Sequence, residues 1–279
     1  PLVWFFLNKK IIMSEQNYNL AFVFPGQGSQ SIAMLSELAE VYPVVKQTFE
    51  QASECLGFDL WQLVQQGPVE DLNQTHNTQP AMLAADVAMW RVWCEQSAVR
   101  PAWMAGHSLG EYSALVCSEA MRFEDAISLV AERGRLMQEA VPAGVGAMAA
   151  IIGLEDHIVV KACADSAADE VVSAVNFNAP GQVVIAGHIA AVERAMAAAK
   201  EAGAKRALKL PVSVPSHCAL MASAAEKLEQ KLSSVQLDIP KMTLIHNVDV
   251  ASHNAEEVMK NALKEQLFKP VRWVDGIKY

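Results

Sequence analysis

The 279-residue chain contains few cysteines, few aromatic residues and no excess of positive charge. Its five cysteines are scattered, odd in number and form no CxxC pair, so the sequence predicts a reducing, cytoplasmic compartment and no metal site. The formal net charge of −9 argues against nucleic acid or an anionic membrane as the main partner. No apolar run approaches the length of a membrane span, which argues further against a membrane partner.

Hydrophobic residues make up 52% of the chain, enough for a large core in one or two domains. Residues 1–12 differ from the rest, because their hydrophobic part precedes the lysines, the reverse of a signal peptide, and no small-residue cleavage site follows. Met13 resembles a genuine start. We therefore expect residues 1–12 to be a leader or non-native segment outside the fold.

The most informative motif is Gly-His-Ser-Leu-Gly at 106–110. A short apolar run precedes it at 101–105, and a helical pattern follows it at 111–117. A strand, a tight turn and a helix in this order are typical of a nucleophile elbow, although the five letters alone also fit an ordinary glycine-rich turn. Ser108 would then lie at a helix N-terminus, where the backbone N–H of Leu109 could donate to an oxyanion.

A serine nucleophile needs a base, and His217 is the best candidate. It follows a segment stiffened by Pro211 and Pro215, and a rigid segment can hold an imidazole against a hydroxyl. His107 adjoins the serine, but neighbours on a sharp turn point apart, so we interpret it as structural support. From spacing alone, a buried histidine bonded to a backbone carbonyl is the commoner arrangement for His217.

Residues 144–211 have a pattern of their own. We expect strands at 147–154, 171–177, 182–187 and 207–210, with helices at 155–168 and 189–202. This β-α-β-β-α-β order is typical of a ferredoxin-like domain. The predicted fold is therefore α/β: a hydrolase-like large domain with a parallel sheet and a nucleophile elbow, formed by 13–143 and 212–279, with a ferredoxin-like small domain inserted at 144–211.

Within the large domain, we expect a buried strand at 20–24, a strand at 242–246 and a helix at 256–267. The dipeptide Gln79-Pro80 is predicted to open a long helix, because proline is favoured at a helix start. Two bodies of this kind would leave a cleft between them, which suits an extended ligand.

Four motifs occur in order: FPGQGSQ at 24–30, GHSLGEYSALV at 106–116, ERG with MQ at 132–138, and VPSHCALM at 214–221. Together they resemble the malonyl-CoA:acyl carrier protein transacylases of bacterial fatty acid synthesis, and the resemblance extends from about Ala21 to the end of the chain. That family continues for several more elements, including a Gly-Pro-Gly loop, so we expect the C-terminal portion to be missing here.

The resemblance implies a role for several residues. The backbone N–H of Gln27 would be the second oxyanion donor beside Leu109. Arg133 would pair with the free carboxylate of a malonyl group, and an acetyl group would leave that guanidinium unpaired. The backbone carbonyl of Gln266 would orient the histidine, giving a dyad. Asp249, which follows a strand, is the positional alternative for a triad acid and is better interpreted as a turn former.

The implied reaction moves malonyl from malonyl-CoA to Ser108 and then to the phosphopantetheine thiol of acyl carrier protein, with ping-pong kinetics and no cofactor. Lys205 and Arg206, with Lys200 and Lys209 nearby, form a candidate basic patch for docking the acidic carrier protein, although a solvated face is equally consistent with these charges. A serine hydrolase or thioesterase that uses water, and an inactive fragment, remain alternatives.

Overall fold

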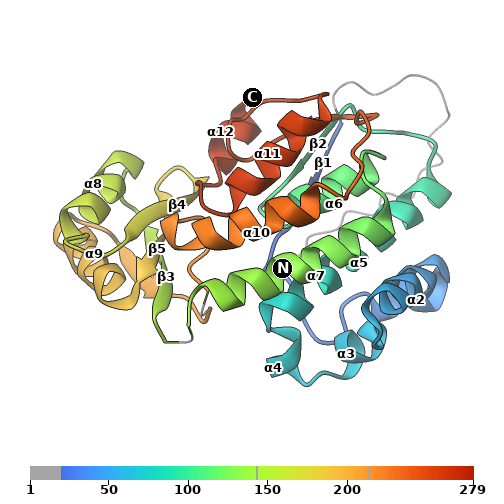
Figure 1. Cartoon of the computed structure of the whole chain (residues 1–279), viewed down its shortest axis with the longest axis horizontal. Coiled ribbons are helices and arrows are strands. Elements are labelled where there is room, and N and C mark those ends of the chain that lie inside the picture. The colour runs from blue at the N-terminus through green and yellow to red at the C-terminus, as the bar shows by residue number, and fades with distance from the viewer. Residues whose placement is uncertain (1–19, 143, 213) are drawn as a thin grey trace.

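The computed structural model of the chain describes residues 20–142, 144–212 and 214–279. The predicted leader, residues 1–12, lies outside the described residues. The described chain forms a larger part, built on a parallel sheet, and a smaller part, built on an antiparallel sheet (Figure 1). No helix in these ranges combines the length and the apolar character needed to cross a membrane.

The parallel sheet has three strands, β1 (Ala21–Phe24), β2 (Trp103–Gly106) and β7 (Thr243–Ile245), in the order β1-β2-β7. Both pairings are parallel, so the carboxyl ends of all three strands lie at one edge of the sheet. The segments that follow these strands are therefore brought together there, although they are about 80 and 140 residues apart in sequence. This edge positions the candidate site.

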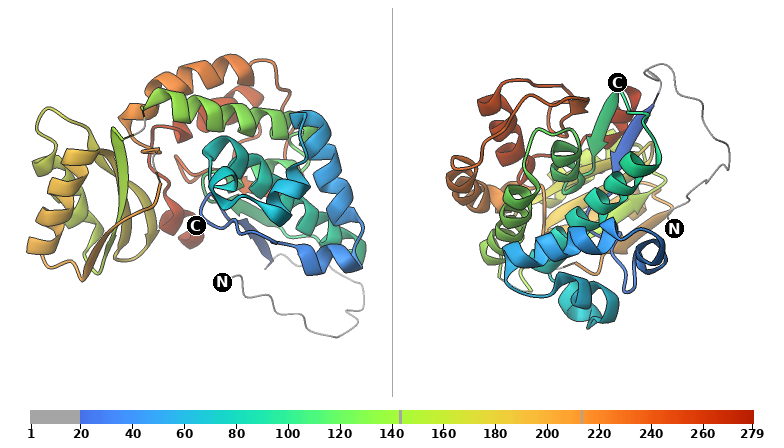
Figure 2. Two further views of the ribbon diagram at one scale, coloured as in Figure 1. Left: turned by 90° about the horizontal axis from the view of Figure 1, so that it is seen from below. Right: turned by 90° about the vertical axis from the view of Figure 1, so that its right-hand side faces the viewer.

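Helices surround this sheet and supply most of the larger core (Figures 1 and 2). They are α1 (Ser36–Val41), α2 (Val44–Leu56), α3 (Leu60–Gln66), α4 (Val69–Leu72), α5 (Thr75–Gln96), α6 (Gly110–Cys117), α7 (Phe123–Ala140), the 3₁₀ turn η1 (Ala219–Met221), α10 (Ala222–Leu232), α11 (Glu256–Gln266) and α12 (Trp273–Lys278). Helix α6 packs against β1 and β2, and α5 packs against α7.

The predicted start of the long helix at Gln79-Pro80 is wrong, because α5 begins at Thr75 and contains Pro80. Tertiary contacts hold the turn before the proline. The Thr78 hydroxyl donates to the carbonyl of Leu72 at 2.6 Å, and the His76 N–H donates to a side chain of α7 at 3.2 Å. Proline removes only one backbone hydrogen bond at this point, and these contacts offset the loss.

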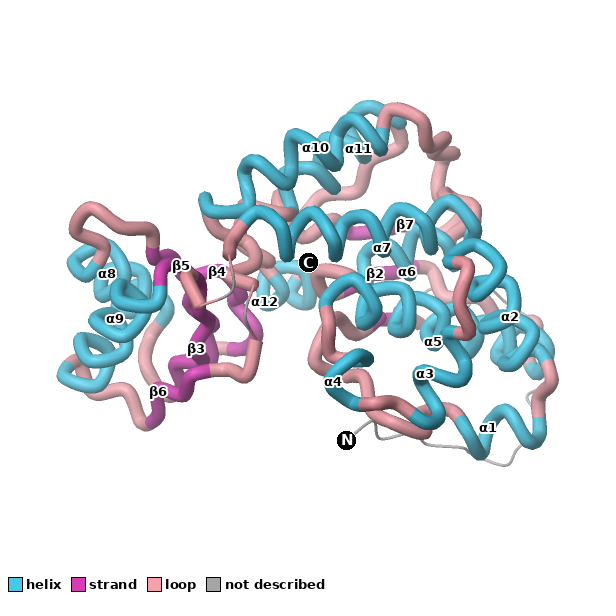
Figure 3. The backbone as a smooth tube through the Cα atoms, turned by 60° about the horizontal axis from the view of Figure 1, so that its bottom comes forward, coloured by secondary structure: helices cyan, strands magenta, loops and turns pink. Residues whose placement is uncertain are grey.

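The smaller part contains β3 (Gly146–Ile152), α8 (Asp156–Ser166), β4 (Val172–Ala179), β5 (Gln182–His188), α9 (Ile189–Glu201) and β6 (Arg206–Lys209). The predicted elements agree with these bounds to within two residues. The strands lie in the order β4-β5-β3-β6 and each pair is antiparallel. Figure 3 shows α8 and α9 together on one side of these strands.

The two faces of this antiparallel sheet have different partners. Ala147, Ala149 and Ile151 belong to a core cluster with residues of α8 and α9. Since side chains alternate along a strand, Met148 lies on the other face, in a cluster that includes Cys218 of the larger part. At the edge strand β4, the backbone of Val271 exchanges hydrogen bonds with residues 175 and 177 at 2.8 and 3.0 Å, so the two parts are also joined through main chain.

Candidate active site

Ser108 lies in the tight turn between β2 and α6, with a φ of 52°, which is uncommon for a residue other than glycine. The flanking glycines are sterically required. A Cβ on Gly106 would lie 1.8 Å from the carbonyl carbon of Gly110, and a Cβ on Gly110 would lie 2.2 Å from the carbonyl oxygen of Phe24. The turn therefore depends on glycine at both positions, and it presents the serine at the carboxyl edge of the sheet.

Asn247, which follows the neighbouring strand β7, holds this turn. Its Oδ1 accepts from the Ser108 N–H at 2.7 Å, and its Nδ2 donates to the carbonyl of Gly106 at 2.7 Å. Sequence reasoning missed this residue. The available signal was its place just after a predicted strand, because the ends of parallel strands meet at one edge.

His217 contacts Ser108 across 109 positions of sequence, with Nε2 2.8 Å from the serine Oγ. Its Nδ1 lies 2.6 Å from the backbone carbonyl of Gln266. A carbonyl can only accept, so Nδ1 carries the hydrogen and Nε2 is free to accept from the hydroxyl. Burial, followed by the positive charge of Arg133, lowers the pKa of His217 to about 3. The imidazole is therefore neutral near pH 7, as a base must be.

Arg133 lies beside the same serine, with Nη2 3.3 Å from the Oγ. The side chain is buried, with a residue exposure of 1%, and burial lowers its pKa. Its hydrogen-bond acceptors include two amide oxygens: Nη1 donates to Gln79 Oε1 at 2.8 Å and Nη2 donates to Gln266 Oε1 at 3.0 Å. Within the described ranges, its Nε has no partner.

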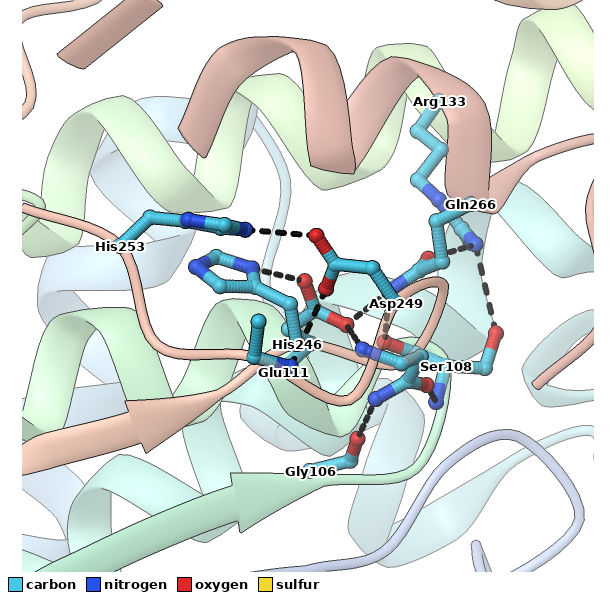
Figure 4. Close-up of polar contacts among 10 residues, drawn as sticks. Gly106, Ser108, Glu111, Arg133, His246, Asp249, His253 and Gln266 are labelled. Carbon is cyan, nitrogen blue, oxygen red and sulfur yellow. Dashed lines mark hydrogen bonds and ion pairs between the residues drawn. The ribbon is translucent and has the colours of Figure 1, made fainter. Parts of the chain in front are cut away.

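Behind the serine turn, a buried carboxylate ties three segments together (Figure 4). Glu111 Oε1 is 2.7 Å from His246 Nδ1, and Oε2 accepts from the Asn247 N–H at 3.0 Å and from Gln266 Nε2 at 2.8 Å. The same Nε2 lies 3.0 Å from the Ser108 carbonyl. Gln266 therefore contacts the serine turn and Arg133 through its side chain and His217 through its backbone. The sequence analysis anticipated only the backbone contact, and it missed Glu111 and His246.

Gln27 and Leu109 both line the cavity that contains Ser108. Neither backbone N–H donates to another group within the part of the chain that the structure describes. The side chain of Gln27 donates to Thr75 Oγ1 at 3.3 Å. The two residues that line the cavity with Ser108 thus keep backbone N–H groups with no acceptor among the described residues.

The cavity measures about 220 Å³ and lies between the two parts of the molecule. His107 lines it and does not contact Ser108 Oγ. Instead its Nε2 is 2.8 Å from Asn178 Oδ1, across to the smaller part, in keeping with a supporting role. The lining residues are Gln27, His107, Ser108, Leu109, Arg133, Met137, Met148, Asn176, Asn178, Val184, Leu210, Val212, Val214, Ser216 and His217.

Other candidates lie outside this cluster. Lys205 and Arg206 are exposed at one end of the small sheet, where Arg206 pairs with Ile152, whereas the cavity borders the opposite end of β3 at Met148. Asp249 Oδ2 bonds to His253 Nε2 at 2.6 Å, as suits a turn former and not a triad acid. Among the described residues, no group of three His, Cys, Asp or Glu side chains is placed to hold a metal ion.

The chain is similar to known proteins over most of its length. The acyl transferase domain family matches residues 21–279. The chain is 59% identical, over 93% of its length and 84% of the relative, to the malonyl CoA-acyl carrier protein transacylase of Salmonella typhimurium. It is similar to the crystal structure of an acyl carrier protein S-malonyltransferase from Vibrio cholerae, with a TM-score of 0.91, 62% identity, and coverage of 92% of this chain and 84% of that one.

A second solved structure is a type II PKS acyl-carrier protein in complex with its malonyl-transacylase. The TM-score to it is 0.92 at 57% identity, and the match covers 92% of this chain and 84% of that one.

Proposed function

This chain belongs to the acyl transferase family, and within it to the malonyl CoA-acyl carrier protein transacylases, and on that premise we propose that it acts through a malonyl ester on Ser108. Its activity is that of an acyl-carrier-protein S-malonyltransferase, with malonyl-CoA and acyl carrier protein as its partners. The single observation that carries the proposed mechanism is the 2.8 Å contact between Ser108 Oγ and His217 Nε2.

In the first half-reaction, Ser108 Oγ attacks the thioester carbonyl of malonyl-CoA and its proton passes to His217 Nε2. The N–H groups of Gln27 and Leu109 stabilise the oxyanion, since both line the cavity and lack other acceptors among the described residues. The tetrahedral intermediate collapses to malonyl-Ser108, and the coenzyme A sulfur leaves with the proton held by His217. Arg133 pairs with the malonyl carboxylate, because its guanidinium borders the cavity beside the serine.

In the second half-reaction, the phosphopantetheine thiol of the carrier protein attacks the malonyl ester. His217 takes the thiol proton and returns it to Ser108 Oγ, which restores the free enzyme. The neutral state of His217 in the free protein supports this cycle, because the base must begin each half-reaction unprotonated.

We further propose that the Ser108 turn is a nucleophile elbow, supported by its positive φ and its place between β2 and α6. The four-stranded unit is proposed to be a ferredoxin-like domain at 144–211, inserted into a large domain of 13–143 and 212–279. The strand order β4-β5-β3-β6, with α8 and α9 on one face, supports that division. We also propose that Lys205 and Arg206 dock the acidic acyl carrier protein.

The test is intact-mass measurement after treatment with malonyl-CoA, comparing the wild type with Ser108→Ala and Ser216→Ala. Ser216 also lines the cavity and serves as a matched serine control. We expect a mass increase of one malonyl group in the wild type and in Ser216→Ala, and none in Ser108→Ala. Equal labelling of Ser108→Ala would refute the mechanism. Adding carrier protein then separates transfer from release of free malonate, the product that a hydrolase would form.

A further inference from the structure

The buried guanidinium of Arg133 is held by neutral side chains. Gln79 Oε1 accepts from Nη1 at 2.8 Å and Gln266 Oε1 accepts from Nη2 at 3.0 Å. Buried charges are normally paired with an opposite charge, because an unpaired ion is costly to remove from water. Glu111 is close enough to favour the charged form of Arg133, but among the described residues its oxygens bond only to other partners.

The guanidinium borders the cavity and keeps hydrogen-bonding capacity that no described residue uses. Arg133 lines the cavity, its Nη2 is 3.3 Å from Ser108 Oγ, and its buried Nε has no partner among the described residues. Its guanidinium carbon lies 5.5 Å from the centroid of the Tyr112 ring, a further neutral contact. Neutral groups therefore hold the guanidinium in place without neutralising its positive charge.

Gln79 differs from the residues that could touch substrate. It is fully buried, it is absent from the cavity lining, and its Nε2 lies 3.4 Å from Met137 Sδ. Its amide oxygen thus acts on the acyl group only through Arg133. A glutamate at this position would have nearly the same shape and would place a counterion 2.8 Å from the guanidinium, in a site where charges interact strongly.

We propose that Gln79 is a positioning residue that sets acyl specificity. Its neutral amide orients the Arg133 guanidinium without neutralising it. The positive charge can then pair with an acyl group that carries a carboxylate. The proposal rests on the proposed function, since it assumes that Arg133 pairs with the acyl carboxylate. It extends that function by assigning the selection between acidic and neutral acyl groups to a residue outside the cavity.

The experiment measures kcat/KM for acylation of Ser108 by malonyl-CoA and by acetyl-CoA, using quenched intact-mass time courses. The variants are Gln79→Glu and Gln79→Met, with Gln138→Glu as a matched amide-to-carboxylate control. Gln138 also lies in the interface of α5 and α7, but its amide oxygen bonds to His76 and not to Arg133. Circular dichroism melts establish that each variant is folded.

We expect Gln79→Glu to lower the malonyl-to-acetyl ratio of kcat/KM by at least about tenfold, because the carboxylate cancels the charge that selects malonyl. Gln79→Met should lower malonyl acylation several-fold and leave acetyl acylation unchanged, since the charge remains but loses an orienting contact. Gln138→Glu should keep the wild-type ratio.

A folded Gln79→Glu protein with the wild-type ratio would overturn the proposal. If that variant does not fold, Gln79→Met decides, because equal losses for both acyl groups would mean that Gln79 supports the site without selecting between them. These outcomes differ from failure of the proposed function, in which the wild type itself would form no malonyl-Ser108.

Discussion

The two walls of the cavity differ in what they contribute. One wall, the reactive wall, consists of Gln27, Ser108, Leu109, Arg133 and His217, which come from loops and from helix α7 of the larger part. The other, the sheet wall, consists of Met148, Asn176, Asn178 and Val184, which come from the antiparallel sheet. The first carries the groups proposed to react, and the second supplies apolar surface with two amides.

The reactive wall must be more rigid than the sheet wall. The reactive wall is backed by buried hydrogen bonds, with Glu111 alone joining three segments. Each such bond contributes about 1 kcal/mol, but an unpaired buried partner costs about 1–3 kcal/mol, so the network resists local rearrangement. The sheet wall has no comparable demand, because excluding water requires close contact and not a fixed hydrogen-bond geometry.

The largest expected effect comes from removing the base of the reactive wall. His217→Ala should slow formation of malonyl-Ser108 by roughly 10³-fold, within the range known for loss of a general base. Rapid-quench mass spectrometry measures this rate. His157→Ala, at an exposed position of the smaller part, is the control and should behave as the wild type. If His217→Ala slows the formation of malonyl-Ser108 by less than tenfold, His217 is not the base.

Loss of Asn247 should have the next largest effect, because it removes both hydrogen bonds of its side chain to the Ser108 turn. Asn247→Ala should lower the acylation rate by about 10- to 100-fold and the free energy of unfolding by about 2 kcal/mol. The exposed Asn254→Ala is the control. Wild-type acylation by a folded Asn247→Ala protein would show that the turn keeps its geometry without the amide.

The pH dependence of the acylation rate distinguishes a buried base from an ordinary histidine. His217 must be neutral to act. Because its pKa is lowered to about 3, the imidazole stays mostly neutral as the pH falls from 7 to 5. Acylation by the free enzyme should therefore stay nearly constant from pH 7 to pH 5. A histidine with its usual pKa near 6.5 would lose roughly 25-fold of its neutral form, and of its rate, over that interval. Single-turnover kcat/KM against pH distinguishes the two, and an inflection near pH 6.5 would contradict the buried, neutral base.

Opening the sheet wall should change the fate of the acyl-enzyme more than its formation. Met148→Ala and Val184→Ala should raise hydrolysis of malonyl-Ser108 by about threefold, because both truncations admit water, and acylation should change less than twofold. The decay of the acyl-enzyme mass without carrier protein measures this. Val160→Ala, exposed on α8 at 47%, is the control, and slower acylation without faster hydrolysis would reassign the sheet wall to substrate binding.

The smallest effect is expected at the docking patch, which lies at the end of the small sheet away from the cavity. Lys205→Glu with Arg206→Glu should raise KM for the carrier protein by about two- to fivefold and flatten its dependence on salt. Lys161→Glu, which breaks an exposed pair with Asp165, is the matched charge reversal. If KM is unchanged in the first protein, or equally raised in the second, the patch is an ordinary solvated face.

Much of the local structure could be predicted because its signals are local. Short apolar runs on either side of the turn at 178–181 predict β4 and β5, and the glycines of 106–110 predict the turn that Ser108 occupies. Pro80 shows the limit of that reasoning, because a local rule predicts a helix start where packing against α7 extends the helix by five residues. The role of Gln79 has no local signature, and the one signal for Asn247 is its place just after a predicted strand.

Local patterns along the chain predict the order of strands, turns and helices, and residue type with its flanking elements indicates Ser108 as a nucleophile. His217 is a candidate from its rigid segment, and the resemblance of four ordered motifs to a known family indicates both His217 and Arg133. Which of these groups meet depends on the tertiary structure. The register of β1, β2 and β7 brings Asn247 to the Ser108 turn, and the packing of α5, α7 and α11 leaves Arg133 between two amides. Such contacts join residues 54 to 139 positions apart, and their hydrogen bonds form only after burial has placed the partners.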